Sequence, residues 1–171
     1  MTLVTKHGGD MLEKRTAVFS ECERYRYLLR IVWDPSAPLM ANISLNPSTA
    51  DEMHDDPTLR RIKEFARKFG HGGLLMTNLF AFRATDPKDM KAEKNPVGQA
   101  DWNDVHIREA AVEAKTIVCA WGMHGEFLGR GAEVRSMLAR AGHALKCFKL
   151  CSNGQPYHPL YLPASSDLID F

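Results

Sequence analysis

Two short segments carry the side chains best suited to chemistry. The first, Ser44-Leu45-Asn46-Pro47-Ser48-Thr49-Ala50-Asp51, follows one apolar run, and the second, Tyr157-His158-Pro159, follows another. Asparagine both donates and accepts hydrogen bonds, serine adds a hydroxyl, and proline fixes the backbone. Histidine titrates near neutral pH. These types predict a ligand site built from both segments, although a strand-to-loop turn with local caps would use the same residues at the first.

An acidic stretch follows the first segment. Its ligand-type side chains are Asp51, Glu52, His54, Asp55 and Asp56. They suit a divalent cation but lack a recognised metal-binding spacing. Several should instead cap or flank a helix that begins at Pro57, where the positive end of the helix dipole favours them. We therefore expect no metal and no cofactor, and we take Asp51 as a candidate catalytic acid or base.

Four apolar runs of strand length position these segments. They cover residues 38–45, 74–82, 116–121 and 144–150. Helical patterns alternate with them, over residues 57–69, over 102–114, and from Glu126 or Gly131 to Ala141. This alternation predicts an α/β fold, a three-layer αβα sandwich with a mainly parallel four-stranded central sheet. Ligands of such sheets bind beyond the carboxyl ends of the strands, where both segments begin.

Residues 15–20 and 24–33 are rich in aromatic and branched side chains, with Glu21-Cys22-Glu23 between them. This pattern predicts an N-terminal antiparallel β-hairpin, which we expect at the edge of the sheet. No linker, repeat or low-complexity tract divides the chain. Its 171 residues are therefore expected to form a single α/β domain over 1–171.

Composition excludes several classes of function. Apolar residues make up 44% of the chain and charged residues 25%, values typical of a folded globular protein. The formal net charge is +1, so the whole molecule has no field that would attract nucleic acid or acidic lipid. No segment has the apolar length of a signal peptide or a membrane helix. We expect a cytoplasmic monomer with no membrane partner.

Taken in order, the ends of the four strands resemble the uracil-DNA glycosylase superfamily. Leu45-Asn46-Pro47-Ser48 resembles the asparagine version of its first motif, with Ser44 where a glycine is usual. The run Met76-Thr77-Asn78-Leu79-Phe80-Ala81-Phe82-Arg83 is similar to the strand whose asparagine reads the base. Ala120-Trp121-Gly122 and His158-Pro159 resemble the third strand end and the second motif.

A closer resemblance rests on Leu-Asn-Pro-Ser-Thr-Ala-Asp, Asp-Asp-Pro-Thr, Asn-Leu-Phe-Ala, Ala-Trp-Gly and His-Pro-Leu-Tyr. Together they look like an uncharacterised bacterial and phage family, a domain of unknown function (number 1643). The resemblance covers residues 24–165. It implies a fold like that of uracil-DNA glycosylase through the wider superfamily, but it brings no activity of its own.

The glycosylase likeness implies a partner that is DNA or a nucleotide or base ligand, with a role for each site residue. Asn46 would position water, His158 would donate to the departing base, and Asn78 would read a base edge. Phe80, Phe82, Trp121 or Tyr157 would stack on the base, and Arg83, Arg130 or the basic face of the helix over 57–69 would contact phosphate. The remaining candidate lining residues are Leu45, Pro47 and Ser48.

Three functions follow as alternatives. The first is a DNA glycosylase-like protein that binds a damaged or modified base and excises it hydrolytically. Because Asn46 cannot accept a proton, this chemistry needs Asp51, Asp55 or Asp56 near the water. The second is a binding module for a nucleotide or modified base without turnover. The third is a metal-dependent hydrolase that uses Asp51, His54 and Asp55.

Overall fold

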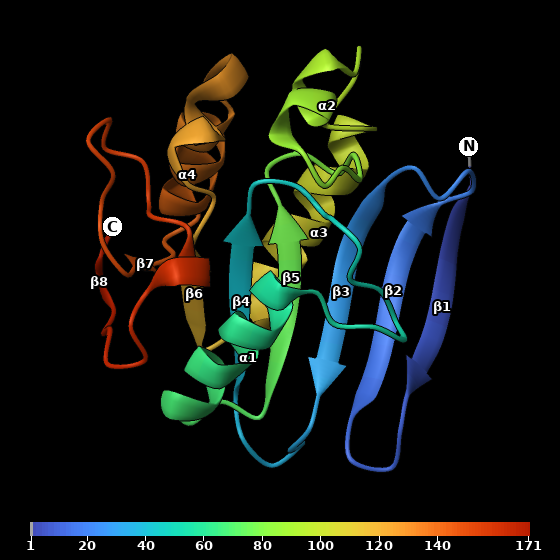
Figure 1. Cartoon of the computed structure of the whole chain (residues 1–171), viewed down its shortest axis with the longest axis vertical. Coiled ribbons are helices and arrows are strands. Elements are labelled where there is room, and N and C mark those ends of the chain that lie inside the picture. Colours follow the sequence, from blue (N-terminus) through green and yellow to red (C-terminus); the bar gives the residue numbers. More distant parts are fainter. Residues whose placement is uncertain (1) are drawn as a thin grey trace.

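One mixed sheet forms the middle layer of the molecule. The computed structural model describes residues 2–171, apart from the side chain of Ala100. The strands are β1 (Leu3–Gly9), β2 (Lys14–Ser20), β3 (Arg26–Val32), β4 (Leu39–Ser44), β5 (Gly73–Asn78), β6 (Thr116–Cys119), β7 (Leu145–Cys147) and β8 (Ile169–Asp170). Their order across the sheet is β1-β2-β3-β5-β4-β6-β7-β8 (Figure 1).

The α/β class is confirmed, but the sheet is larger than predicted and mixed in direction. Strand β4 pairs in parallel with β5 and β6, and β6 pairs in parallel with β7. Strands β1, β2, β3 and β8 are antiparallel to their neighbours. The predicted hairpin exists as β2 and β3, but its expected place at the edge was wrong. Strand β1 covers β2 on one side, and β3 pairs with β5 on the other.

Helices cover both faces of this sheet. They are α1 (Pro57–Lys68), α2 (Pro87–Ala92), α3 (Ala100–Glu113) and α4 (Arg130–Arg140), with the 3-10 helices η1 (Met123–Gly129) and η2 (Pro159–Tyr161). Figure 1 shows α1 in front of β4 and β5 and α3 behind them. Within the described part of the chain, no helix has the length and apolar character needed to cross a bilayer.

Alternate strand residues serve the two helical layers. Met40, Leu74 and Met76 belong to the core that contains α1, while Ala41 and Leu75 belong to the core that contains α3 and α4. On the face toward α1, alternate residues of β4 are Met40, Asn42 and Ser44. Those of β5 are Leu74, Met76 and Asn78, so each strand ends in a polar residue on this face. Ser44 and Asn78 are partners in the β4–β5 register. Two polar side chains therefore lie together where the apolar rows under α1 stop.

A bulge in β3 changes which face one arginine occupies. Val18 pairs with Leu28, but Phe19 pairs with Arg26, so Tyr27 is an extra residue on β3. An extra residue reverses the alternation beyond it. Tyr27 therefore stacks on His106 of α3, whereas Arg26 lies on the α1 side of the sheet with Leu29.

Candidate functional site

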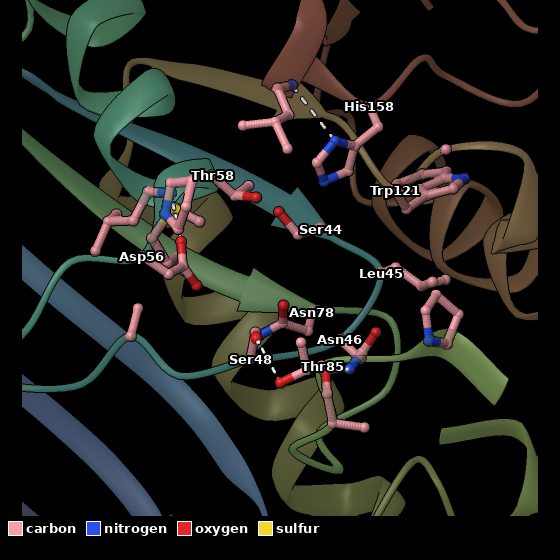
Figure 2. A pocket seen from close by; sticks show the side chains of 18 of the residues that line it. Ser44, Leu45, Asn46, Ser48, Asp56, Thr58, Asn78, Thr85, Trp121 and His158 are labelled. Carbon is pink, nitrogen blue, oxygen red and sulfur yellow. Dashed lines mark hydrogen bonds between the residues drawn. The ribbon is translucent and has the colours of Figure 1, made fainter. Parts of the chain in front are cut away.

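A cavity of about 580 Å³ opens beyond the carboxyl ends of β4, β5 and β6. This volume is in the ordinary range for small-molecule sites. Of the residues proposed from the sequence, the cavity is lined by Leu45, Asn46, Ser48, Asn78, Trp121 and His158. Figure 2 shows Ser44, Thr58, Asn78 and His158 reaching into one space, although they come from four different elements.

Hydrogen bonds join the loop of Asn46 to the loop that contains Ala84 and Thr85. Its Nδ2 donates to the carbonyl oxygens of Pro47 at 3.1 Å and Ala84 at 2.7 Å. The Ala84 amide donates back to the Pro47 carbonyl at 2.9 Å, and the Ser48 hydroxyl donates to Thr85 Oγ1 at 3.3 Å. Because Nδ2 is engaged twice, Oδ1 is the atom that Asn46 can offer to a ligand.

Asn78 is the deepest amide of the cavity. Only 1% of its surface is exposed, and its Nδ2 has no hydrogen-bond partner among the described residues. Its backbone carbonyl accepts from Asn103 Nδ2 at 3.1 Å. A buried amide that lacks partners is costly, so a ligand that pairs with it would be favoured. Asn78 can recognise a ligand edge that places an acceptor beside a donor.

Ser44 adds a second donor next to this amide. Asn42 Nδ2 donates to the Ser44 hydroxyl oxygen at 2.9 Å, which leaves the hydroxyl hydrogen to point elsewhere. Ser44 was expected at the end of its strand, in the place where a glycine is usual in the glycosylase motif, with no binding role. Thr58 and Thr85, which also line the cavity, had no sequence signal beyond their proximity to prolines.

His158 is half-buried and has a defined tautomer. Its Nδ1 accepts from the Leu160 amide at 3.4 Å, so we assign the proton of the neutral ring to Nε2. Burial lowers the pKa of His158, and the charge of Asp56 only partly opposes this. The ring is therefore neutral at neutral pH and carries an N–H donor. Gly122, at φ +73°, passes close to it, and a methyl group there would contact the His158 Cβ.

Of the three acids considered as bases, Asp56 lines the cavity. Its Oδ1 caps α1 by accepting from the Leu59 amide at 2.7 Å. Asp51 instead turns back on its own loop, where its Oδ1 accepts from the amides of Met53 and His54 at 2.8 Å each. The structure thus brings Asp56, rather than Asp51, to the other candidate residues.

Asp55 belongs to a separate ionic cluster, which we define as Glu13, Arg15, Asp55 and Lys63. Arg15 pairs with both acids of the cluster, and so does Lys63. Lys63 belongs to the helix whose basic face was expected to contact phosphate, but its side chain is buried by these partners. Over residues 2–171, no group of three His, Cys, Asp or Glu side chains is arranged to hold a metal ion.

Arg26 is a lining residue that the sequence analysis did not find. It is 3% exposed, and its Nη1 donates to the Ala50 carbonyl. Its Nε has no partner within the described part of the chain. Burial lowers the pKa of Arg26 to about 10, with Asp56 opposing, so it stays charged at neutral pH. The sequence signal for this residue was an arginine in an otherwise apolar strand. Regular alternation of side chains along β3, however, assigns Arg26 to the α3 face together with Arg30.

The cavity lining includes one of the four aromatic candidates, Trp121, and leaves out Phe80, Phe82 and Tyr157. Trp121 lines the cavity and donates from Nε1 to Gln155 at 2.7 Å. Phe80 is buried against Phe127, with ring centroids 5.7 Å apart, and Phe82 packs edge-on against Tyr25 at 5.6 Å. Trp121 is itself only 1% exposed, so none of the four aromatic candidates presents an open ring face to the cavity.

The remaining candidates have neighbours of their own. Tyr157 packs into the α1-side core, Pro47 is buried, and Arg83 lies over the Phe19 ring at 5.1 Å. Arg130 was expected to reach phosphate, but it is buried and paired with Asp104 and Glu133. Its role is structural.

The fold and the cavity define a class: an α/β protein with a ligand-sized cavity at the carboxyl ends of parallel strands. The model of the family described as "Protein of unknown function (DUF1643)" matches residues 26–160. The chain belongs to this family. No curated protein and no solved structure matches it significantly. The matched region begins at Arg26 and includes Asn46, Asp56, Asn78 and His158.

Proposed function

We propose that the cavity binds a nucleobase and that the protein is a DNA glycosylase-like hydrolase acting on a damaged or modified base. The observation that carries the proposal is that Asn46, Asn78 and His158, which come from separate parts of the chain, line one cavity. The order of these residues along the chain, and the parallel strands that end beside them, support the likeness to the uracil-DNA glycosylase superfamily.

The bound base would be fixed by its edge. Asn78 offers Oδ1 as acceptor and Nδ2 as donor, which suits an edge with adjacent N–H and C=O groups. The apolar part of the lining includes Leu29, Leu45 and Met76, against which the base would pack. Extruding a base from a duplex costs a few kcal/mol by order of magnitude, so pairing at Asn78 and burial must offset that cost.

Hydrolysis breaks the N-glycosidic bond as water adds to C1′ of the sugar. The bond electrons leave with the base, which carries negative charge in the transition state. The neutral His158 can donate its Nε2–H to that charge. Asn46 Oδ1 can orient the water, and Asp56 can accept its proton, because a carboxylate is basic enough where an amide is not. The released base then takes up a proton from solvent.

The test is base release from a broad panel of single- and double-stranded DNA that carries damaged or modified bases, measured by mass spectrometry of free bases. Wild-type protein should release at least one base. Asn78→Ala and His158→Ala should lose release, and Asn95→Ala, a change at an asparagine outside the cavity, should keep it. Failure of the wild type to release any base at high enzyme concentration would eliminate the glycosylase.

A binding module without turnover is the second candidate. It is favoured by the engagement of the Asn46 amide with two carbonyl groups and by the commitment of Asp56 to the cap of α1. Both groups then serve structure rather than proton transfer. Binding of a nucleotide or base that Asn78→Ala abolishes, with no product formed, would establish this function instead.

A further inference from the structure

We propose that the cavity contains an oxyanion subsite formed by Arg26, so that its ligand is a nucleobase or nucleoside bearing a carboxylate or a phosphate. The inference rests on the proposed function for the base-like part of the ligand and deepens it by naming the ligand class. The charge on Arg26 supplies an interaction that a neutral base would leave unused.

Carboxylates compensate the other buried cations of the chain. Arg15, Lys63 and Arg130 are each as buried as a core residue, and each has two carboxylate partners. Arg26 is at least as buried, yet none of the described carboxylates forms an ion pair with it. A buried unpaired charge is strongly unfavourable. A ligand oxyanion would compensate it as carboxylates do in the other three cases.

The Arg26 guanidinium also has unused hydrogen-bonding capacity. It has five N–H donors in a fork that matches carboxylate and phosphate oxygens. The contact to Ala50 uses Nη1, while Nε is buried without a partner among residues 2–171. The guanidinium therefore has donor capacity that an acceptor-rich ligand group would satisfy.

Arg26 lies next to Asn78. The Arg26 amide donates to the Ala81 carbonyl at 2.9 Å, and Leu29 pairs with Met76. These contacts place Arg26 alongside the end of β5, which is Asn78. The acidic group must therefore be part of the moiety that enters the cavity. Because Arg26 is buried, a backbone phosphate of DNA lying outside the cavity cannot make this contact.

Asp56 defines how the anion would be held. It is the lining carboxylate whose charge acts on both Arg26 and His158. Since Asp56 repels an oxyanion, the anion should bind the guanidinium on the side away from it. The neutral His158 adds no opposing charge.

The wild-type protein alone provides the first test. Isothermal titration at constant ionic strength compares uracil with its 6-carboxylate, and uridine with uridine 5′-monophosphate, with inorganic phosphate as a separate probe. We expect the acidic member of at least one pair to bind ten-fold or more tightly than its neutral partner. The pair that shows the preference identifies the source of the oxyanion. Equal affinity within both pairs, or no acidic ligand bound, would overturn the proposal.

Arg26→Met and Arg26→Lys provide the second test, with Arg83→Met as a control at a cation outside the cavity. We expect Arg26→Met to abolish the preference for acidic ligands and Arg26→Lys to keep part of it. If the charge awaits a ligand, ligand-free Arg26→Met should melt at or above the wild-type Tm. A preference for acidic ligands that survives in Arg26→Met would contradict the subsite. This holds also where the variant melts at a lower Tm than the wild type.

The subsite and the proposed function fail in different ways. Asn78→Ala should weaken the acidic and neutral members of a pair by the same factor, whereas Arg26→Met should weaken the acidic member. If no DNA substrate releases a base but the acidic preference is present, the glycosylase falls and the subsite remains. If a neutral base is released and no preference exists, the subsite falls alone.

Discussion

The hydrogen bonds of Asn46 explain why an amide, rather than a carboxylate, stands at this position. Its Nδ2 joins the carbonyls of Pro47 and Ala84 and thereby connects two loops at the cavity. A carboxylate has no hydrogen to donate at neutral pH, so an aspartate would face both carbonyl oxygens with negative charge. The amide at this position is required by the loops themselves.

Asn46→Asp should therefore lower the free energy of unfolding by about 1–3 kcal/mol at pH 7, because two hydrogen bonds are lost and like charges meet. Urea denaturation followed by tryptophan fluorescence measures the change. The loss should shrink at about pH 4, where a protonated carboxyl regains a donor. Asn46→Ala, which loses the bonds without the repulsion, should be less harmful. Equal stability of Asn46→Asp and wild type would refute this role.

His158 should make stability depend on pH. Burial holds its pKa below its ordinary value, so the unfolded chain binds a proton first as the solution becomes acidic. The free energy of unfolding should therefore fall as pH drops below about 6.5 and level off below the native pKa. His158→Gln should reduce this dependence between pH 7 and 5. Buried His71, whose pKa is also lowered by desolvation, should retain its share.

Urea titrations at several pH values measure this slope. The control is His7→Gln, a change at an exposed histidine on β1. An unchanged slope in His158→Gln would show that the ring is not held neutral by burial.

At the scale of elements, the residue that caps α1 also lines the cavity. Asp56 caps the helix through Leu59, and its carboxylate also lines the cavity. Asparagine caps helices as well as aspartate does, whereas alanine does not. The two roles are therefore separable by substitution.

Asp56→Ala should lower stability by about 1 kcal/mol, and Asp56→Asn should stay within a few tenths of a kcal/mol of wild type. If Asp56 accepts the proton of water, Asp56→Asn should nevertheless slow base release by about 10²–10⁴-fold. Thermal denaturation and base release on the same preparations measure both effects. Full activity of Asp56→Asn would assign the carboxylate to the cap alone.

Elements with local signals were predictable from the sequence. Sequence patterns predicted the start of α1 at Asp56-Pro57 and the apolar runs of β4, β5 and β6. These signals depend only on residues that are close together in the sequence. Strands β1 and β8 were not found, since edge strands need few apolar residues and their pairing is tertiary. Asn46, Asn78 and His158 were found as residues at strand ends. Arg26 was missed because a bulge, which alternation cannot reveal, selects its face.

For the whole molecule, the ionic cluster connects two parts of the chain. Glu13 and Arg15 precede the region matched by the family model, while Asp55 and Lys63 lie within it. The cluster therefore fastens β2 and the turn before it to the start of α1. Although burial opposes it, hydrogen bonds from Lys63 and Arg15 hold the pKa of Asp55 below its usual range.

Asp55→Ala should destabilise the protein by on the order of 3 kcal/mol, because two buried cations lose a shared partner. In the wild type, the contribution of Asp55 is present above about pH 4, and it should be lost as pH falls through the native pKa. Asp167→Ala, which removes an exposed partner of Lys68, should cost no more than about 1 kcal/mol. Chemical denaturation measures both, and equal losses would contradict the buried network.

The residues that line the cavity come from nearly the whole length of the chain, from Arg26 in β3 to Tyr161 in η2. Contacts between residues so distant in sequence require the closure of long loops, which slows folding. The complete binding site therefore needs the C-terminal part of the chain to be folded onto the rest. Ligand binding would therefore report the completion of folding. A chain still emerging from the ribosome could not form the whole site until its C-terminal part is made.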